Sequence, residues 1–504
     1  MGSISRLVTS IAAGFRREPP KTPETPMVQP RLKRAIQARY DAATPDLQNA
    51  RHFAMADGLS AREANNPGVR ERLRNYARYE TANNCYARGM VNTIADVEMG
   101  SGAHLHLPRP LKAGESLREG LKAIEREFEY WAEETGLWEK LWTLRVAKAT
   151  DGEGIAVLRV NDDLQHLVTL DIQPIEAEQL SHGWQQQTFE PGHVDGVEVD
   201  GLGNIKQYFV LPEHPGDATI TKDSEPMEVI PNGIIHWFRR DRPGQLRGIP
   251  EITPALPLFA QLRRFTLASL TAAETAADIV GIIKSSLVPE EPGDPDRTME
   301  LYEMHRGMFM ELPDGSDISQ LESKHPGPQY KEFKRELLCE IARCLNLPKS
   351  FALGDASDYN YASGRLDRQE FDRHIEVAHR FCERQVLGKI WNAWWGMASL
   401  MDGYFSDEAV ALVNTMRPKW GWPKLGHVDR AKEEQGRETA LRNMTTTLAA
   451  ELDREGIHWE DHLEQVAAER QRMEELGLAA SASDQQPPKE EERESDEELD
   501  KEAA

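Results

Sequence analysis

The sequence is poor in cysteine. A chain of 504 residues does not need disulfides to build a core, and its four cysteines lie too far apart for a CxxC motif. They are Cys85, Cys339, Cys344 and Cys382. We therefore expect assembly in a reducing cytoplasm, with Cys339 and Cys344 as ordinary packing residues of a helix.

Long apolar runs and a surplus of basic residues are lacking as well. No stretch approaches the roughly 20 apolar residues of a membrane-spanning helix, so we expect no membrane segment. The chain has 84 Asp and Glu against 60 Lys and Arg, a formal net charge of -24. Such a field repels a phosphate backbone, which argues against a tight nucleic-acid binder more strongly than against a channel through which DNA slides.

The common signatures of catalysis are also missing. The sequence has no Walker A loop, GxSxG elbow, HExxH motif or EF-hand loop, which argues against an ATPase, an α/β-hydrolase and a zincin. We predict no enzymatic activity, no catalytic residue and no cofactor.

Two short motifs have an acidic or metal-ligating character, and we interpret both as structural. Residues 151–154 (Asp-Gly-Glu-Gly) have neither the further glycines nor the lysine of a phosphate loop, so we predict a turn between a helix and a strand. His374 and His379 lie near Glu370 and Cys382 on one predicted helix. Five residues apart, the two histidines point in different directions, so we predict no zinc site.

The chain has two ends of unusual composition. Residues 1–50 are polar and rich in proline, which is typical of an arm that orders only against a partner. Residues 479–504 combine proline and glutamine with a dense run of Glu and Asp, the composition of a disordered tail.

Between these ends the periodicity indicates a mainly helical α+β fold. Apolar residues at helical spacing predict helices over residues 61–99, 117–138, 250–278, 329–347 and 364–400, and two or three short charged helices over 428–478. Short β-rich runs predict strands at residues 155–160, 167–170, 196–199, 205–211, 280–283 and 307–312. The helix predicted over 364–400 would be a rod on the order of 50 Å long, more than a globular domain of this size needs.

Several segments resemble one known family. The run from Ile234 to Pro250 (IIHWFRRDRPGQLRGIP), followed by EITPAL, closely resembles the hallmark of the lambda family of phage portal proteins. Other segments resemble further parts of that family in the same order along the chain: residues 51–53, 65–67, 72–75, 172–178, 196–200, 359–365, 420–423 and 427–429. Ordered similarity of this kind is more specific than any single motif.

The resemblance implies a ring, typically of twelve copies, and a division of each chain into named parts. These are an arm (1–50), an α/β wing (51–249), stem helix 1 (250–278), an α/β clip (279–328), stem helix 2 (329–352), a tunnel loop (353–363), a spine helix with a return to the wing (364–426), a helical crown (427–478) and the acidic tail (479–504). Neighbouring copies in such a ring would cover the long spine helix.

The same resemblance places candidate DNA-channel residues in the tunnel loop and just after it. They are Gly354, Asp355, Ser357, Asp358, Tyr359, Asn360, Tyr361 and Arg365. The helix predicted from residue 329 adds a basic set, Lys331, Lys334 and Arg335, with interleaved glutamates. This set either forms ion pairs on a solvated helix face or touches phosphates in the channel.

The function implied is that of a DNA conduit at one vertex of a capsid, in the virion, after assembly in the host cytoplasm. Its expected partners are further copies of the chain, double-stranded DNA in transient contact, the terminase large subunit, the major capsid or scaffold protein and the head-completion proteins of the neck. Two alternatives remain open: a packaging-associated nuclease or ATPase, and a scaffold or adaptor that uses its acidic tail.

Overall fold

A computed structural model describes most of the chain. The described residues are 51–110, 114–181, 192–217, 225–278, 282–285, 316–319, 329–357, 359–423, 430–453, 457 and 459–477. The chain divides into two units, residues 1–59 and 60–504, and all elements below belong to the second. The predicted arm (1–50) and acidic tail (479–504) lie outside the described residues.

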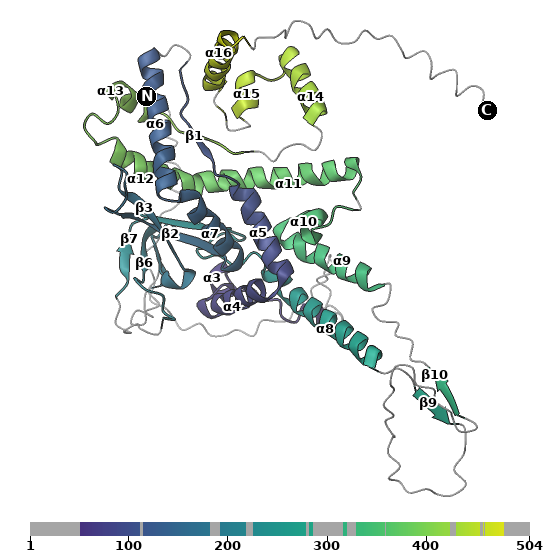
Figure 1. The fold of residues 1–504 in the computed structure, drawn as a ribbon. Helices are drawn as coiled ribbons and strands as arrows, with labels where there is room; N and C mark the ends of the chain where they lie inside the picture. The colour runs from purple at the N-terminus through teal and green to yellow at the C-terminus, as the bar shows by residue number, and fades with distance from the viewer. Residues whose placement is uncertain are drawn as a thin grey trace, which may run out of the picture. The chain divides into compact units, whose positions relative to one another are not determined.

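The fold mixes helices and sheets, as predicted (Figure 1). The helix predicted over residues 61–99 is divided into three separate helices. These are α3 (Ala61–Ala64), α4 (Pro67–Asn83) and α5 (Cys85–Met99). Asparagine separates them: Asn66 caps α4 through the amide of Val69, and Asn84 caps α5 through the amides of Tyr86 and Ala87. Asparagine side chains compete with helical hydrogen bonds, so they favour new helix starts.

The helix predicted over 117–138 ends earlier than expected. Helix α6 spans Glu115–Glu134, and Gly136 then adopts a left-handed backbone with φ of 58°. Glycine is the residue that ends helices in this way. Trp138 therefore belongs to a separate helix, α7 (Leu137–Thr150), which the sequence patterns did not predict.

Two antiparallel sheets follow. The first has the order β3-β2-β8, with β2 at Glu153–Val160, β3 at Leu170–Ile175 and β8 at Ile234–Phe238. Strand β3 begins where the predicted strand 167–170 ends, so that prediction was displaced along the chain. A short 3₁₀ turn, Ala177–Gln179, leads out of this sheet.

The second sheet has the order β4-β5-β6-β7 and contains the strands predicted at residues 196–199 and 205–211, which pair as a hairpin. Its strands are β4 (His193–Val194), β5 (Val197–Val199), β6 (Ile205–Val210) and β7 (Met227–Val229). At the turn between β5 and β6, Asp200 accepts hydrogen bonds from the amides of Leu202 and Asn204.

A third pairing joins distant parts of the chain. Strand β1 (His104–His106) pairs antiparallel with β11 (Lys419–Gly421). Both strands have three residues, too few for a period-two pattern in the sequence. Helix α13 (Asp407–Val413), which was also not predicted, lies between the long helix and β11 in the sequence.

Helices α8 and α9 confirm the two predicted helices around residues 279–328. Helix α8 (Leu256–Asp278) follows a 3₁₀ turn, Thr253–Ala255, so the prolines of this region lie in first turns, where they are tolerated. Strands β9 (Ile282–Ser285) and β10 (Ser316–Ser319) pair within the insert. Strand β9 overlaps the predicted strand 280–283, whereas 307–312 lies outside the described residues.

Helix α9 (Gln329–Ala342) ends sooner than predicted. A 3₁₀ turn, Arg343–Leu345, follows it, and Asn346 then adopts φ of 54°. Pro348 caps a separate short helix, α10 (Lys349–Leu353), instead of closing a longer one. The predicted second stem helix (329–352) thus consists of two helices joined by a bend.

The long helix is continuous from Tyr361 to Ala398, with a change of pitch inside it. Helix α11 (Tyr361–Cys382) passes into a π-helical segment (Glu383–Leu387) and then into α12 (Gly388–Ala398). Figure 1 shows α11 and α12 end to end. The predicted rod is confirmed, although it begins at Tyr361 and not at Gly364.

This helix contributes to two different apolar cores. Phe371 and Ile375 of α11 pack with α4, α5, α8, α9 and α10. Trp391 and Trp394 of α12 pack with α6, α7 and the β3-β2-β8 sheet, where Phe128 lies against both tryptophans. A third core fills the space around the four-stranded sheet.

Three charged helices end the described chain, as predicted. They are α14 (Arg430–Arg442), α15 (Leu448–Asp453) and α16 (Trp459–Glu475). Among the described residues, every helix is too short or too polar to cross a membrane.

Candidate channel segment and the buried arginine junction

The segment predicted as the tunnel loop is shorter than its predicted range, 353–363. Leu353 ends α10, Gly354 follows in a left-handed backbone with φ of 64°, and Tyr361 begins α11. Residues 354–357, 359 and 360 form the described part of the loop, and Asp358 lies outside the described residues. Tyr361 and Arg365 are therefore helical, and the Arg365 side chain is exposed.

Asn360 fixes the end of this loop. Its Oδ1 accepts a hydrogen bond from the amide of Ser363 at 2.9 Å, and its own amide donates to Ser363 Oγ at 3.2 Å. This reciprocal capping box satisfies two amides that the start of α11 would otherwise leave unpaired.

Tyr359 is anchored on both sides of its hydroxyl. The hydroxyl donates to the Asp367 carboxylate of α11 and accepts from the Ser350 amide of α10 at 3.3 Å. Two effects raise the pKa of Tyr359 above its usual value: partial burial, which is the larger, and the hydrogen bond to Asp367. The tyrosine therefore joins α10 to α11, which sets the span of the loop between them.

Asp355 links the loop to the predicted basic set. Its Oδ1 accepts a hydrogen bond from the Ser357 amide at 2.9 Å. That bond lowers the pKa of Asp355, and the positive charges of Arg335 and Lys331 lower it further. The structure thus brings the basic residues of α9 and the loop into one neighbourhood.

The three basic residues have different surroundings. Lys331 is exposed, whereas Lys334 and Arg335 are half-buried. The Lys334 Nζ lies 5.2 Å from the ring centroid of Tyr86 and 5.9 Å from that of Tyr330, which is cation-π distance. Lys331 therefore has the greatest freedom to meet a ligand, and Lys334 also has a packing role.

Arg247, in the segment RGIP, has hydrogen-bond partners in several separate segments of the described chain. Its Nε and Nη2 donate to the two carboxylate oxygens of Glu153 at 2.8 Å, and Nη2 also donates to the Ala177 carbonyl at 2.9 Å. Its Nη1 donates to the carbonyls of Leu180, at 2.9 Å, and of Asp195. All five N–H donors are satisfied, which a buried guanidinium requires.

Glu153 is the counter-ion of this junction. Burial alone would raise its pKa, but the charge of Arg247, together with the His236 imidazole whose Nε2 lies 3.4 Å from Oε1, holds the pKa well below its usual value. Its Oε1 also accepts from the amide of Gly248. The pair therefore fixes the start of β2 against the RGIP segment.

Two glycines make this contact possible. A Cβ on Gly152 would lie 2.5 Å from the Ile249 carbonyl carbon, and Gly152 has φ of 89°. A Cβ on Gly248 would lie 2.0 Å from the Gly152 carbonyl oxygen. Residues 151–154 are thus a helix-to-strand turn, as predicted, and glycine is needed where two backbones meet.

Further ion pairs extend the junction to α4. Arg70 binds Asp195, Arg74 Nε lies 3.0 Å from Glu178 Oε1, and Arg78 binds Asp151 through two bonds of 2.7 and 2.9 Å. Asp151 therefore forms an ion pair with an arginine, as Glu153 does. Both acidic groups of the 151–154 motif serve the fold.

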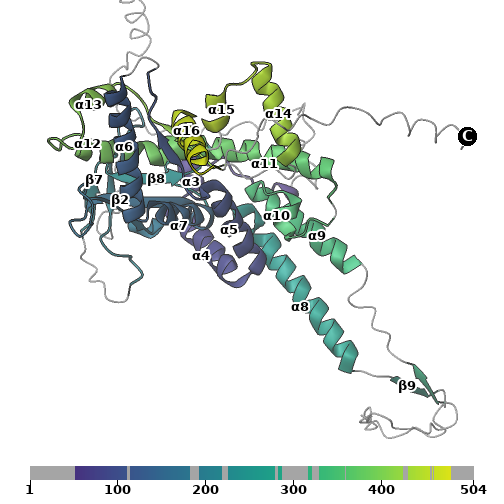
Figure 2. The ribbon, with the colours of Figure 1, turned by 45° about the horizontal axis from the view of Figure 1, so that its top comes forward.

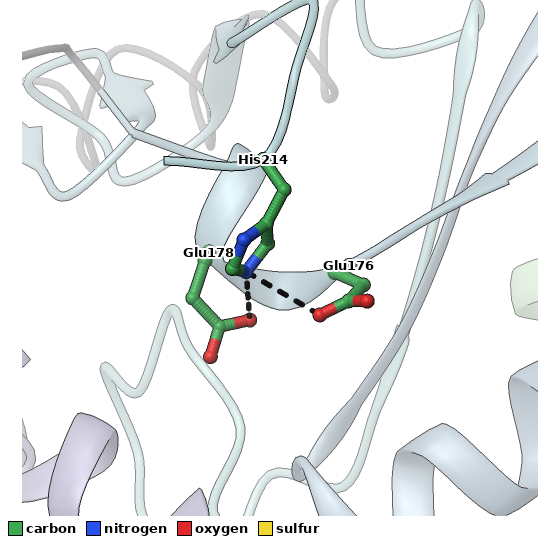
Figure 3. A group of neighbouring side chains, drawn as sticks. All are labelled: Glu176, Glu178 and His214. Atoms are coloured by element: carbon green, nitrogen blue, oxygen red, sulfur yellow. Dashed lines mark ion pairs between the residues drawn. The ribbon is translucent and has the colours of Figure 1, made fainter. Parts of the chain in front are cut away.

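Glu176, Glu178 and His214 form a group of metal-ligating side chains at the edge of this network (Figure 3). His214 Nε2 lies 3.4 Å from Glu176 and 3.7 Å from Glu178. Arg78 Nη2 already lies 3.3 Å and 3.0 Å from the same two carboxylates. A metal ion among these ligands would stand next to a guanidinium that Asp151 holds in place, so the donor set fits an ion-pair cluster.

The residues considered for zinc are used elsewhere. His379 Nε2 lies 2.9 Å from the Glu98 carbonyl, and its ring stacks on Trp422 with centroids 4.0 Å apart. Cys382 is buried in the core of α12, and burial lowers the pKa of His374 and His379. In the described part of the chain these side chains do not gather into one ligand group.

A second buried ion-pair cluster lies beside α5. Arg145 binds Glu98 with Nη2 at 2.9 Å, and Arg145 and Lys148 bind Glu251 at 3.0 and 3.2 Å. Burial would raise the pKa of Glu251, but these two cations lower it to about 2. The sequence reasoning missed both clusters, because isolated charged residues are usually at the surface. The one available signal was that Glu153 lies two residues before the apolar run predicted as a strand at 155–160.

Comparison with known proteins agrees with the resemblance found in the sequence. The family model described as "Phage portal protein, lambda family" matches residues 48–378. A curated relative, "Probable portal protein" of Halomonas phage phiHAP-1, is 22% identical over 493 residues, which cover 92% of this chain and 91% of the relative.

Solved structures of low identity are also similar to the chain. A chain from "Neck of empty GTA particle computed with C6 symmetry" is 14% identical, with a TM-score of 0.43, and the match covers 76% of this chain and 93% of that chain. A chain from "Neck of native GTA particle computed with C12 symmetry" is 14% identical, with a TM-score of 0.40 and coverage of 76% and 90%.

Proposed function

We propose how this chain, which belongs to the lambda family of phage portal proteins, carries out its portal function. It forms a ring, of twelve copies in the simplest case, at one vertex of a capsid, and double-stranded DNA passes through the central channel. The observation that carries this proposal is the family match over residues 48–378, which includes both helices around the insert.

Each part of the chain has a proposed place in that ring. Residues 51–249 form the wing, α8 and the segment from α9 to α10 form the stem, and residues 279–328 form the clip. The loop before α11 lines the tunnel, the long helix is the spine, and α14, α15 and α16 lie in the crown. The antiparallel pairing of β9 with β10 supports a folded element within the proposed clip.

The clip docks the terminase large subunit during packaging and the head-completion proteins of the neck afterwards. The capsid or scaffold protein meets the outer parts of the ring in the virion. Contacts with DNA are transient and independent of sequence, in keeping with the net charge of -24. We place the following residues at the channel: Lys331, Lys334, Arg335, Gly354, Asp355, Ser357, Asp358, Tyr359, Asn360, Tyr361 and Arg365.

The conduit performs no chemistry in this proposal. Asp151 and Glu153, the acidic residues that an alternative nuclease or ATPase would offer, are bound by Arg78 and Arg247. Nucleotide hydrolysis by the purified chain that disappears in an Asp151→Asn variant would favour the alternative.

Electron microscopy of the purified protein tests the proposal. We expect rings with an axial hole, and a variant lacking residues 479–504 should form them equally well. A chain that stays monomeric or forms compact dimers at high concentration would contradict the portal ring, and rings lost with the tail would favour the adaptor alternative.

A further inference from the structure

Helix α4 turns two arginines toward the interior of the protein and two tyrosines toward solvent. Its inner face buries Arg70 and Arg74, which are 2% and 6% exposed, while Tyr76 and Tyr79 on the opposite face are 56% and 57% exposed. A surface helix of a monomeric protein normally turns its apolar side toward the core. The buried arginines are explained by Asp195 and Glu178, whereas the outward tyrosines have no comparable explanation within the described chain.

The tyrosines continue into an exposed apolar stripe on α8, which lies beside α4 in Figures 1 and 2. The Arg263 guanidinium lies 5.2 Å from the ring centroid of Tyr79. Leu267 and Leu270 follow Arg263 at helical spacing and are 57% and 55% exposed. We call Tyr76, Tyr79, Arg263, Leu267 and Leu270 the α4–α8 face.

The composition of this face is that of a protein contact surface. Tyrosine and arginine are enriched at protein interfaces and in their energetic centres, because both offer a large apolar area and hydrogen-bonding groups. Scattered exposed leucines need no explanation, but two leucines and two tyrosines on adjoining helices form a patch.

The charge around the face selects its partner. Arg72, Arg264 and Glu274 are exposed around it, and Arg263 is paired with Glu80, so its rim has one more basic than acidic residue. The chain as a whole is strongly acidic, with a net charge of -24, so another copy offers complementary charge. The N-terminal 50 residues carry eight basic and four acidic residues, so the arm of the same chain would meet like charge.

We propose that the α4–α8 face is a contact surface for a second copy of this chain. The proposal rests on the ring of the proposed function and names one of its contact faces. In a ring each copy meets its neighbour through two different surfaces, and this face is one of them. Burial in the neighbouring copy accounts for the outward tyrosines of α4.

A double substitution with a matched control tests the face. Tyr76→Asp/Tyr79→Asp adds two charges to it, whereas Tyr130→Asp/Leu202→Asp adds two charges at exposed sites away from it, 52% and 89% exposed. Circular dichroism and thermal melting first establish that both variants fold. Assembly against concentration is then followed by light scattering and electron microscopy.

We expect the control to form rings like the unaltered chain, and the face variant to need at least about tenfold more protein. Equal assembly of the two variants overturns the proposal while leaving the portal ring intact. If the unaltered chain itself forms no ring, the proposed function fails instead, so the two failures are distinguishable.

Chemical labelling gives a second measurement that does not depend on disrupting the ring. In a Cys85→Ser background, which removes the exposed native thiol, Tyr79→Cys should react with a maleimide at least about tenfold more slowly in rings than in dispersed chains. Leu202→Cys should react at one rate in both states. If deletion of residues 1–50 speeds the labelling of Tyr79→Cys in dispersed chains, the arm is the occupant and the proposal is wrong.

Discussion

Arg247 and Glu153 form a buried ion pair that joins the RGIP segment to the first residue of β2, with both carboxylate oxygens 2.8 Å from a guanidinium nitrogen. The same guanidinium holds three carbonyls that lead toward the four-stranded sheet. The pair therefore connects three segments that are remote in the sequence. Buried pairs of this kind bring little net stability when complete, but they are costly to break.

Removing one partner should accordingly destabilise the chain strongly. We expect Arg247→Ala to lower the free energy of unfolding by about 3 to 5 kcal/mol, because Glu153 is left charged and buried. The matched control is Arg239→Ala, whose pair with Asp241 is about half exposed and should contribute about 0 to 1 kcal/mol. Urea unfolding of both variants measures the difference, and equal losses would contradict the junction.

The glycines at this junction allow a test of backbone proximity. Gly152→Ala should cost several kcal/mol or prevent folding, because its Cβ would meet the backbone of Ile249 and Pro250 and φ is 89°. Gly396→Ala is the control, since Gly396 lies in α12 with open space around its Cβ position. That change should stabilise the chain by about 0.4 to 1 kcal/mol. Thermal melting that ranks the two variants in the opposite order would refute the close approach.

The pH dependence of stability should reveal Glu125. Burial raises its pKa to about 7, although the charge of Arg109 acts in the opposite direction. The folded state therefore binds this proton more tightly than the unfolded state, so stability falls as pH rises from about 4.5 to 7. In Glu125→Gln this loss should be smaller by about 1 to 3 kcal/mol between pH 5 and pH 8. Urea titrations at both pH values measure it; an unchanged pH dependence would count against the burial of this carboxyl.

The loop before α11 should depend on its tyrosine hydroxyl. We expect Tyr359→Phe to form rings but to package DNA less well, because α10 and α11 lose their shared hydrogen bonds to Asp367 and Ser350. The combined Tyr359→Ala/Tyr361→Ala variant should show a larger defect. The measurement is the amount of nuclease-protected DNA per capsid. Normal amounts of protected DNA in the double variant would contradict the placement of this loop at the channel.

Lys331 should contribute to DNA affinity without contributing to stability. Lys331→Gln should change the free energy of unfolding by less than about 0.5 kcal/mol, since the side chain is exposed. Its rings should bind DNA more weakly, with the slope of log affinity against log salt reduced by about 0.9 for each phosphate that they no longer neutralise. Arg442→Gln, on α14 and 74% exposed at its side chain, is the control and should leave the slope unchanged. Identical slopes for both variants would place Lys331 outside the DNA path.

Much of the helical framework was predictable, and the reason is local. Helices α8 and α11 have apolar stripes of regular period, and the prolines before α8 are compatible only with its start. Helix α7 escaped prediction because its buried side chains include Arg145 and Thr150, and because Trp138 and Trp142 widen the apolar face beside its leucines, so no narrow stripe appears. Strands β1 and β11 have three residues each and find their partner far along the chain.

The candidate site was less predictable than the fold. The family resemblance located the loop, but the anchoring of Tyr359 depends on Asp367 and Ser350, which carry no distinctive motif. The pairing of Arg247 with Glu153 depends on how three segments meet in space, and the sequence of no single segment predicts that meeting. Charged residues in a sequence indicate the surface by default, and only the packing shows which of them are enclosed.

The π-helical segment at Glu383–Leu387 has a consequence for tolerance to insertion and deletion. On one side of it Phe371 packs into the core of α4 and α9, and on the other Trp394 packs into the core of α6. A π-helical turn holds one residue more than an α-helical turn, so deleting a single residue here restores an α-helical turn and leaves both faces in place. Deleting a single residue elsewhere in the helix turns the tryptophan face of α12 by about 100° relative to Phe371. The two cores therefore fix the length of the α-helical parts to the residue, and the π-helical segment is the one part of this helix where a residue can be lost without turning one core away from the other.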